Sequence, residues 1–153
     1  MRNKTLEIIL IWLSIIIVAV LGSIFVNLGM DWFNSLNKPS EWIPNIIIPI
    51  VWTIIYLTYA IYLTIWRNNS PIPAKTYILL IANGILNILW CLFFFTLNLL
   101  FVGNIFIILN LIFGFLLLYD IAKQNLKFSF ILVIYPIWLS IATSLNLSLW
   151  ILN

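Results

Sequence analysis

The sequence contains no histidine and only one cysteine. The cysteine, Cys91, lies within an apolar run, so no disulfide can form within the chain. The usual zinc sites and a histidine-ligated haem are excluded by the same shortage, and so are catalytic arrangements such as Ser-His-Asp or Cys-His. We therefore expect neither a metal site nor a resident cofactor, and any chemistry would have to come from a bound ligand.

Charge is also scarce. Asp, Glu, Lys and Arg make up 7% of the 153 residues, whereas 65% are hydrophobic. A soluble domain of this length needs far more charge to cover its surface. The net charge of +3 is small and scattered along the chain, which argues against nucleic acid as a partner. The composition predicts an integral membrane protein, with the lipid bilayer as its first partner.

Five apolar stretches are long enough to cross a bilayer, which takes about 20 residues of helix. They cover residues 6–26, 45–66, 77–95, 102–121 and 129–151. The first stretch is longer than the apolar core of a signal peptide and lacks a clean cleavage site, so we expect it to be retained. The sequence thus predicts an all-α integral membrane protein, a single domain over residues 1–153 that forms a bundle of five transmembrane helices.

The connections between these spans predict the orientation of the chain. Only the first connection, residues 27–44 (loop 1), is long; the others cover residues 68–75, 96–101 and 122–128. With five spans, the N-terminus shares one side of the membrane with the second and fourth connections. Six of the seven positive residues fall on that side, and Lys38 is the exception. Because positive residues favour the cytoplasm, we expect a multi-pass protein of the cell membrane. Its N-terminus would be cytoplasmic, and loop 1 and the C-terminus would lie outside.

Aromatic and amide side chains recur on single faces of three of the expected helices. Spacings of three and four residues bring side chains to one side of a helix, and unpaired amides are costly in lipid. We therefore expect these faces to point into the bundle. They are formed by Trp52, Tyr56, Tyr59, Leu63 and Trp66 in the second span, by Asn83, Asn87, Trp90 and Phe94 in the third, and by Trp138, Ala142 and Asn146 in the fifth.

Depth along the helices indicates where these side chains meet. At a rise of about 1.5 Å per residue, Trp52 and Asn87 lie roughly 10 Å and 12 Å below the loop 1 side of the membrane. Asn146 lies near the same side, and Trp138 lies near the middle of the membrane. The sequence therefore predicts a cavity beneath loop 1, with Trp52 and Tyr56 in one wall.

Two structural explanations compete with a ligand pocket. Asn83 and Asn87 could serve only to join helices by hydrogen bonds. Tryptophans near the ends of spans often form a belt at the membrane interface, and we expect this of Trp12, Trp66 and Trp150. Trp52 and Trp138 lie deeper than a belt requires, which favours the pocket.

Four ordered motifs cover nearly the whole chain. They are residues 32–40 (WFNSLNKPS), Val51-Trp52 followed by Tyr56, Tyr62-Leu63 and Trp66, residues 86–95 (LNILWCLFFF), and residues 138–146 (WLSIATSLN). Together they resemble the motifs of the TspO/MBR family, which includes the translocator protein. The resemblance implies a five-helix membrane bundle, often a homodimer. It also implies binding of porphyrins and other hydrophobic ligands in a pocket closed by loop 1.

Spacing and resemblance together define the expected ligand site and its lid. Aromatic faces would stack on a planar macrocycle, and the amides would orient its polar edge. The ligand-binding residues are expected to be Trp52, Tyr56, Asn87, Trp90, Trp138, Ala142 and Asn146, and the lid residues Trp32, Lys38 and Pro39.

Three functions are compatible with this site. The first is a membrane receptor or carrier for tetrapyrroles of the protoporphyrin IX type, with porphyrin as ligand. The second is an enzyme that degrades porphyrin in the light, with Trp52 and Trp138 as candidates to relay an electron or radical. The third is a membrane stress regulator or structural subunit whose aromatic faces serve only helix packing.

Overall fold

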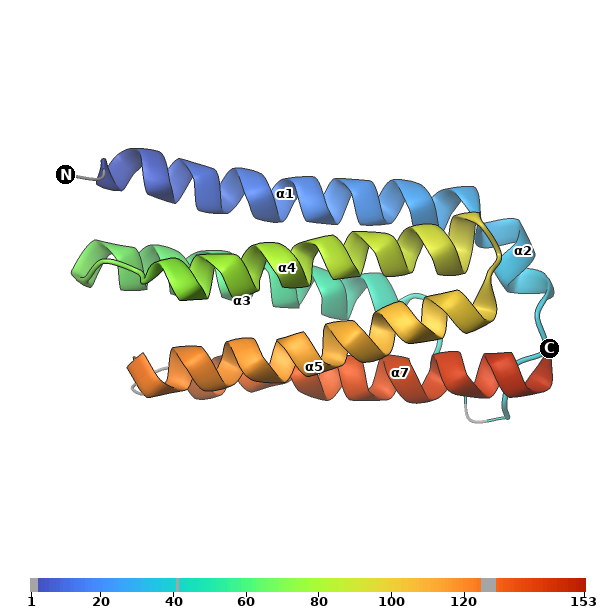
Figure 1. Cartoon of the computed structure of the whole chain (residues 1–153). Helices are drawn as coiled ribbons and strands as arrows, with labels where there is room; N and C mark the ends of the chain where they lie inside the picture. Colours follow the sequence, from blue (N-terminus) through green and yellow to red (C-terminus); the bar gives the residue numbers. More distant parts are fainter. Residues whose placement is uncertain (1–2, 41, 125–128) are drawn as a thin grey trace.

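A computed structural model describes residues 3–40, 42–124 and 129–153 of the chain. Its five long helices are each apolar enough to cross a membrane (Figure 1), so the predicted all-α membrane bundle is confirmed. The helical elements in chain order are α1 (Lys4–Leu28), α2 (Met30–Ser35), α3 (Ile47–Asn69), α4 (Ala74–Cys91), the π-helix η1 (Leu92–Thr96) that continues α4, α5 (Leu100–Gln124), the 3₁₀-helix η2 (Phe130–Val133) and α7 (Ile134–Leu152).

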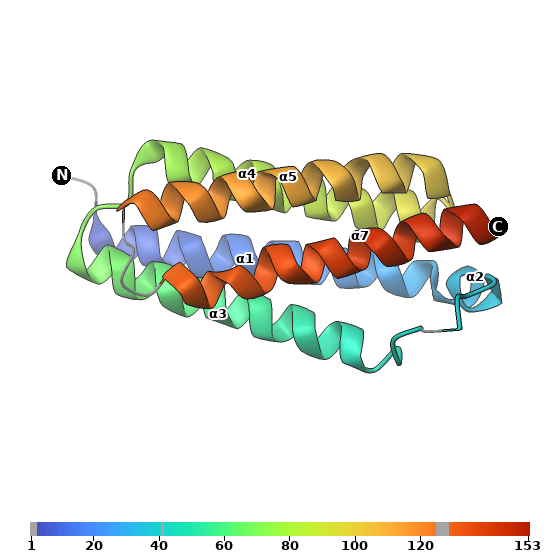
Figure 2. The same ribbon diagram turned by 90° about the horizontal axis from the view of Figure 1, so that it is seen from below.

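The five long helices pack as a ring in the order α1, α4, α5, α7 and α3. Helix α1 lies against α3 and α4, α5 lies against α4 and α7, and α3 closes the ring on α7. Figures 1 and 2 show the helices running along one long axis, with the N-terminus at one end and α2 and the C-terminus at the other. Inward-facing groups from helices that are distant in the sequence therefore meet in the centre.

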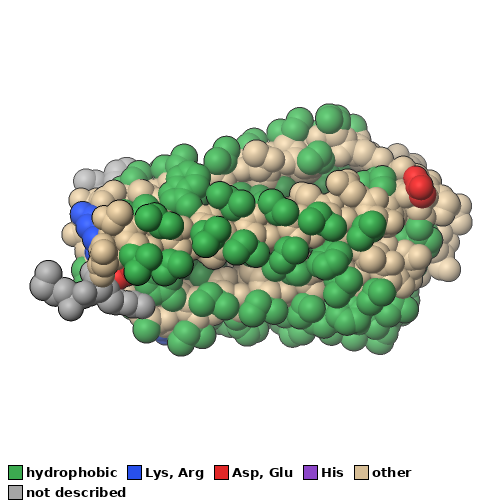
Figure 3. All heavy atoms as spheres, turned by 90° about the horizontal axis from the view of Figure 1, so that it is seen from above, with side chains coloured by type: hydrophobic (Ala, Val, Ile, Leu, Met, Phe, Trp, Pro, Cys, Tyr) green, Lys and Arg blue, Asp and Glu red, His purple; other side chains and the backbone are tan. Residues whose placement is uncertain are grey.

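The sides of the bundle are apolar. Large side chains such as Ile9, Ile61 and Phe115 are about half exposed. In the face that Figure 3 presents, hydrophobic side chains cover the long sides, and charged side chains appear only near the two ends. Exposed apolar surface on this scale is not stable in water. Together with five helices of membrane-spanning length, it marks a multi-pass membrane protein in contact with the lipid bilayer.

Local sequence determines where two of the helices begin and end. The Asn3 side-chain oxygen accepts hydrogen bonds from the backbone N–H groups of Thr5 (3.1 Å) and Leu6 (3.4 Å), which caps α1. After η1, Asn98 adopts a left-handed backbone with φ of 58°, and the Leu99 N–H donates to the Phe93 carbonyl at 2.9 Å. The left-handed residue ends the helix, and the chain turns directly into α5.

The amides predicted to face the interior are buried, with Asn83, Asn87 and Asn146 exposed by 7%, 3% and 6%. The Asn83 amide nitrogen donates to the Asn110 side-chain oxygen at 2.7 Å. The Tyr135 hydroxyl donates to the Asn83 side-chain oxygen at 2.7 Å. These bonds join α4, α5 and α7 and satisfy polar groups that no water can reach inside the membrane.

Three local expectations are wrong. Residues 27–44, expected as a loop, contain helix α2, because the apolar Phe33 gives this short segment a buried anchor. Residues 122–124, expected in a loop, extend α5. Trp66, expected at the membrane interface, is only 4% exposed, since it packs edge-on against Tyr62 with ring centroids 6.1 Å apart. Two residues of the orientation argument, Arg2 and Lys127, lie outside the described residues.

Candidate functional site

A cavity of about 280 Å³ lies beneath residues 29–40 and 42–46, which we call the lid. This is the position at which the sequence predicts a cavity. None of the described residues that line it is charged, so its polar groups are amides and hydroxyls. The lining comprises Ala19, Gly22, Ser23, Val26 and Asn27 of α1, Met30, Phe33, Asn45, Ile48, Pro49, Trp52 and Tyr56 from the lid and α3, and Asn87, Trp90, Cys91 and Phe95 of α4 and η1.

One wall of this cavity is aromatic. The Trp52 ring stacks on Tyr56, with centroids 5.7 Å apart and an interplanar angle of 28°, and it lies 5.9 Å from the Trp90 ring at 34°. Tyr135 meets Trp52 edge-on at 6.1 Å and is not among the described residues that line this cavity. Because each ring contacts the next, the wall is a rigid apolar surface of the kind that favours flat ligands.

Three of the seven expected ligand residues lie behind this wall. Asn146 is buried, and its side-chain oxygen accepts a hydrogen bond from the Trp90 indole nitrogen at 3.0 Å. Its amide nitrogen donates to the Ala142 carbonyl at 2.9 Å, which fixes the orientation of the Asn146 side chain. Ala142 and Trp138, 7% and 6% exposed, belong to the core around the wall. These residues hold the wall in place, whereas Trp52, Tyr56, Asn87 and Trp90 line the cavity itself.

The lid is anchored by Phe33. This side chain is 4% exposed, lines the cavity, and packs 5.2 Å from the Phe95 ring and 5.8 Å from the Trp42 ring. Of the expected lid residues, Trp32 meets Phe94 edge-on at 6.0 Å, beside the cavity rather than in it. Met30, Phe33 and Asn45 are the lid residues that line the cavity, and Phe33 is the buried one of the three.

Asn37 joins the lid to the end of α7. Asn37 and Asn153 exchange two hydrogen bonds of 2.9 Å and 3.0 Å near the surface. Lys38 acts within the lid, where its ammonium donates to the Phe33 carbonyl at 2.9 Å and lies 4.7 Å from the centre of the Phe33 ring, so it caps the C-terminal end of α2. Pro39 follows as a half-buried residue. The lid is thus attached by surface hydrogen bonds and by the buried Phe33 ring.

Sequence reasoning missed several residues of the cavity. Phe33 stands beside Trp32 in the lid motif, and its apolar character within a polar segment was the available signal. Phe95 lies in the third motif and lines the cavity from the π-helical turn of η1. A π-helical turn has no sequence signature. Asn45 and Cys91 complete the lining, and only the packing of the lid and α4 against α1 places them there.

The described lining of the cavity is uncharged and includes the Cys91 thiol and the Ser23 hydroxyl. Among the described residues, no three His, Cys, Asp or Glu side chains lie close enough together to hold a metal ion. Asn87 and Asn45 offer amide donors and acceptors, and Tyr56 adds a hydroxyl. The arrangement can therefore bind, orient and exclude water from an apolar ligand.

These features define a five-helix membrane protein. Its cavity is uncharged, has an aromatic wall and lies beneath the lid. The sequence profile of the TspO/MBR family matches residues 8–151. The chain therefore belongs to the TspO/MBR family.

Curated relatives come from bacteria and archaea. Tryptophan-rich protein TspO of Bacillus cereus is 26% identical over 133 residues, covering 86% of this chain and 87% of the relative. Tryptophan-rich protein TspO of Chlorobaculum tepidum is 30% identical over 138 residues, covering 86% of both chains. Protein CrtK of Rhodobacter capsulatus is 28% identical over 128 residues, covering 80% of this chain and 78% of the relative. The similarity thus extends over most of each chain.

Proposed function

We propose that this protein binds a planar hydrophobic ligand of the tetrapyrrole class, such as protoporphyrin IX, in the cavity beneath the lid. The observation that carries the proposal is the aromatic wall, in which Trp52 lies between Tyr56 and Trp90 at 5.7 Å and 5.9 Å. Flat aromatic faces attract the π-surface of a macrocycle. Asn87 lines the cavity beside that wall and can bond to the polar edge of the ligand. Membership of the TspO/MBR family supports this function.

Binding of a tetrapyrrole requires the lid to move. The cavity of about 280 Å³ is at the small end of ligand pockets, which usually occupy about 300–1,000 Å³, and a four-ring macrocycle needs more space. The lid is the part of the wall that can yield, because surface hydrogen bonds between Asn37 and Asn153 tie it to the end of α7. Opening also has to release the buried Phe33 ring from Phe95. Opening of the lid both admits the ligand and enlarges the site.

The orientation and assembly of the protein belong to the same proposal. Lys4, Arg67, Lys75 and Lys123 lie at the ends of α1, α3, α4 and α5 away from the lid. By the positive-inside rule this end is cytoplasmic, so the lid faces outward and the protein receives its ligand from that side. We place the chain in the cell membrane as a homodimer, the state that the family resemblance implies.

A second candidate is light-driven degradation of the bound porphyrin. The observation that favours it is the contact between oxidisable rings, since Trp52 touches Tyr56, Trp90 and Tyr135 in turn. In this function the pigment absorbs the light and dioxygen is the oxidant that is consumed, while the adjacent rings relay an electron and are restored at the end of each turnover. Trp138, the other relay candidate from the sequence, is buried in the core that Trp52 packs against, so its part would be indirect.

One experiment tests both candidates. The purified protein is titrated with protoporphyrin IX in the dark while tryptophan fluorescence is followed. We expect saturable quenching that Trp52→Phe and Trp90→Phe weaken and that Trp150→Phe, at a 44% exposed position, leaves unchanged. Absence of saturable binding would refute both candidates and leave the regulatory or structural function. Illumination of the complex then separates them, since only the enzyme forms a new pigment that depends on Trp52.

A further inference from the structure

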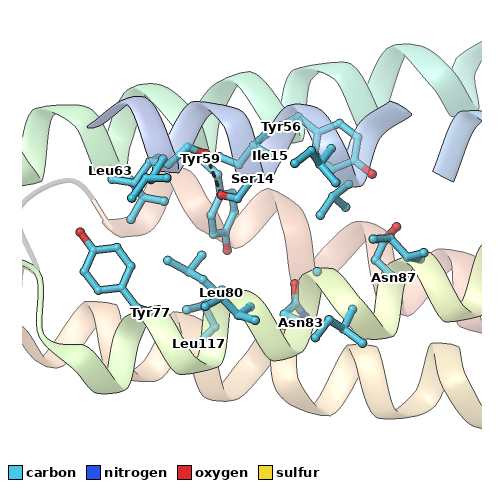
Figure 4. Close-up of a pocket in the computed structure, with 18 of the residues that line it drawn as sticks. Ser14, Ile15, Tyr56, Tyr59, Leu63, Tyr77, Leu80, Asn83, Asn87 and Leu117 are labelled. Carbon is cyan, nitrogen blue, oxygen red and sulfur yellow. Dashed lines mark hydrogen bonds between the residues drawn. The ribbon is translucent and has the colours of Figure 1, made fainter. Parts of the chain in front are cut away.

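A second cavity, of about 570 Å³, lies between α1, α3 and α4 on the side of the lid cavity that faces the N-terminus. Figure 4 shows Tyr59 and Leu63 reaching into it from α3, opposite Tyr77 and Leu80 of α4. We call it the lateral cavity. Tyr56 and Asn87 line both cavities and mark where the two adjoin. It is larger than the lid cavity, and the proposed function does not use it.

Most of the lateral cavity is aliphatic. Isoleucine, leucine and valine make up more than half of its described lining residues, and neither tryptophan nor phenylalanine is among them. Its aromatic residues are four tyrosines, Tyr56, Tyr59, Tyr77 and Tyr135, whereas the lid cavity is lined by Trp52, Trp90, Phe33 and Phe95. Branched aliphatic side chains offer no flat face for stacking, so a lining in which they predominate suits a flexible hydrocarbon better than a planar ring.

The lateral cavity opens toward the bilayer between α1 and α4. Leu10 and Ile17 of α1, and Ile81 and Ile85 of α4, line the cavity and are nevertheless 51%, 45%, 58% and 52% exposed. Side chains that belong both to a cavity and to the lipid-facing surface mark an opening. The hydrocarbon that surrounds this part of the protein is the acyl chains of the membrane.

The length of the lateral cavity matches one leaflet. Its lining on α1 runs from Glu7 to Val18, a rise of roughly 16 Å at about 1.5 Å per residue. The hydrocarbon of one leaflet is about 15 Å deep, half of a core of about 30 Å. At the end of the cavity nearest the N-terminus, Glu7 accepts hydrogen bonds from Arg67 at 2.7 Å and from the Tyr77 hydroxyl at 2.9 Å. This charged cluster lies at the depth of lipid head groups.

We propose that the lateral cavity holds one acyl chain of a membrane phospholipid. The chain enters sideways between α1 and α4, its head group stays at the level of Glu7, Arg67 and Tyr77, and its end reaches toward Tyr56 and Asn87. The bound chain fills the aliphatic space and supports the side of the lid cavity where the two cavities adjoin. This inference goes beyond the proposed function and does not depend on it.

Photocrosslinking from within the bilayer tests the proposal. The full chain is reconstituted in phosphatidylcholine vesicles that contain a phosphatidylcholine with a diazirine on one acyl chain, and labelled peptides are mapped after irradiation. We expect labels on Tyr59, Leu63 and Leu117, which line the cavity and are only 6%, 1% and 1% exposed. Lipid at the outer surface cannot reach them. Labels confined to outward positions such as Ile78 and Ile137, 65% and 55% exposed, would overturn the proposal.

Two matched serines provide the variants. Ser14 lines the lateral cavity and bonds to the Ile11 carbonyl at 2.9 Å. Ser144 lies on the outside of α7 and makes the same local bond, to the Ile141 carbonyl at 2.7 Å. Ser14→Trp is expected to block the cavity and to reduce interior labelling severalfold, whereas Ser144→Trp leaves it unchanged. Equal interior labelling in the two variants would also overturn the proposal.

A porphyrin titration of the same variants keeps the two proposals apart. Ser14 does not line the lid cavity, so Ser14→Trp is expected to retain saturable quenching by protoporphyrin IX. That result also shows that the variant is folded. If the wild-type protein shows interior labelling but no porphyrin binding, the proposed function fails while the lipid site stands.

Discussion

Replacing Gly29 with alanine is expected to displace the lid. Gly29 joins α1 to α2 and lies against η1, where a Cβ atom would come within 1.9 Å of the Phe95 carbonyl oxygen and 2.4 Å of its carbonyl carbon. Favourable carbon contacts begin near 3.5 Å, so α2 and η1 would have to separate by roughly 1.5 Å. The obstacle is backbone, which no rotamer change can move. We therefore expect a loss toward the upper end of the roughly 1–3 kcal/mol that overpacking costs.

Gly22→Ala is the matched control for this prediction. Gly22 lines the lid cavity, but a Cβ there would lie 3.5 Å from the Cys91 sulfur and 3.9 Å from the Asn87 side-chain oxygen, both ordinary contacts. Alanine is also favoured over glycine inside a helix by about 1 kcal/mol, so this variant should be at least as stable as the wild type.

Thermal unfolding in one detergent, followed by circular dichroism, measures the difference. A loss of 1 kcal/mol lowers the melting temperature by roughly 2–4 °C in a chain of this size, so Gly29→Ala should melt several degrees below Gly22→Ala. It should also bind protoporphyrin IX more weakly, because α2 carries Phe33 over the cavity. Equal melting temperatures and affinities for the two variants would refute the reasoning.

Two further predictions concern the buried hydrogen bonds. Tyr135→Phe removes the hydroxyl that bonds α7 to α4 and should lower stability by about 0.6 kcal/mol, the average for hydrogen bonds between membrane helices, and by at most about 1.7 kcal/mol. Tyr119→Phe, at a 59% exposed position, should have the melting temperature of the wild type, and an equal loss in both variants would contradict the assignment. Asn146→Ala leaves the Trp90 indole without its acceptor and should weaken protoporphyrin IX binding roughly fivefold, the equivalent of about 1 kcal/mol. The matched control is Asn69→Ala at the exposed end of α3. Affinities are measured by fluorescence titration. If both variants bind protoporphyrin IX like the wild type, the orientation of Trp90 does not matter for binding.

Much of the fold could be predicted from the sequence because membrane spans follow from local properties. A helix must be apolar over about 20 residues to cross the bilayer, and lipid leaves no alternative to internal hydrogen bonding. The inward faces were predictable for the same reason. Asn83 and Asn87 could not face lipid without a partner, and both are buried, with Asn83 paired to Asn110 and Tyr135.

The lid was less predictable because its structure depends on a few contacts with distant residues. Its composition is polar and contains a Lys-Pro pair, which indicated a loop. Helix α2 exists there because Phe33 packs against Phe95 and Trp42, and because Lys38 bonds to the carbonyl at the end of that helix. Neither contact has a periodic signal in the sequence.

The sequence by itself determined that this chain crosses the membrane five times, which helix faces turn inward, and that aromatic and amide groups gather under the lid. Each of these follows from hydrophobic length and helical spacing within one segment. Only the tertiary structure decided which inward residues line a cavity. Trp52 and Trp90 form the wall, whereas Asn146 lies behind it as the hydrogen-bond partner of Trp90. The lateral cavity was likewise invisible in the sequence, because a void depends on how closely α1 approaches α3 and α4, and that distance is set by packing between segments far apart in the chain.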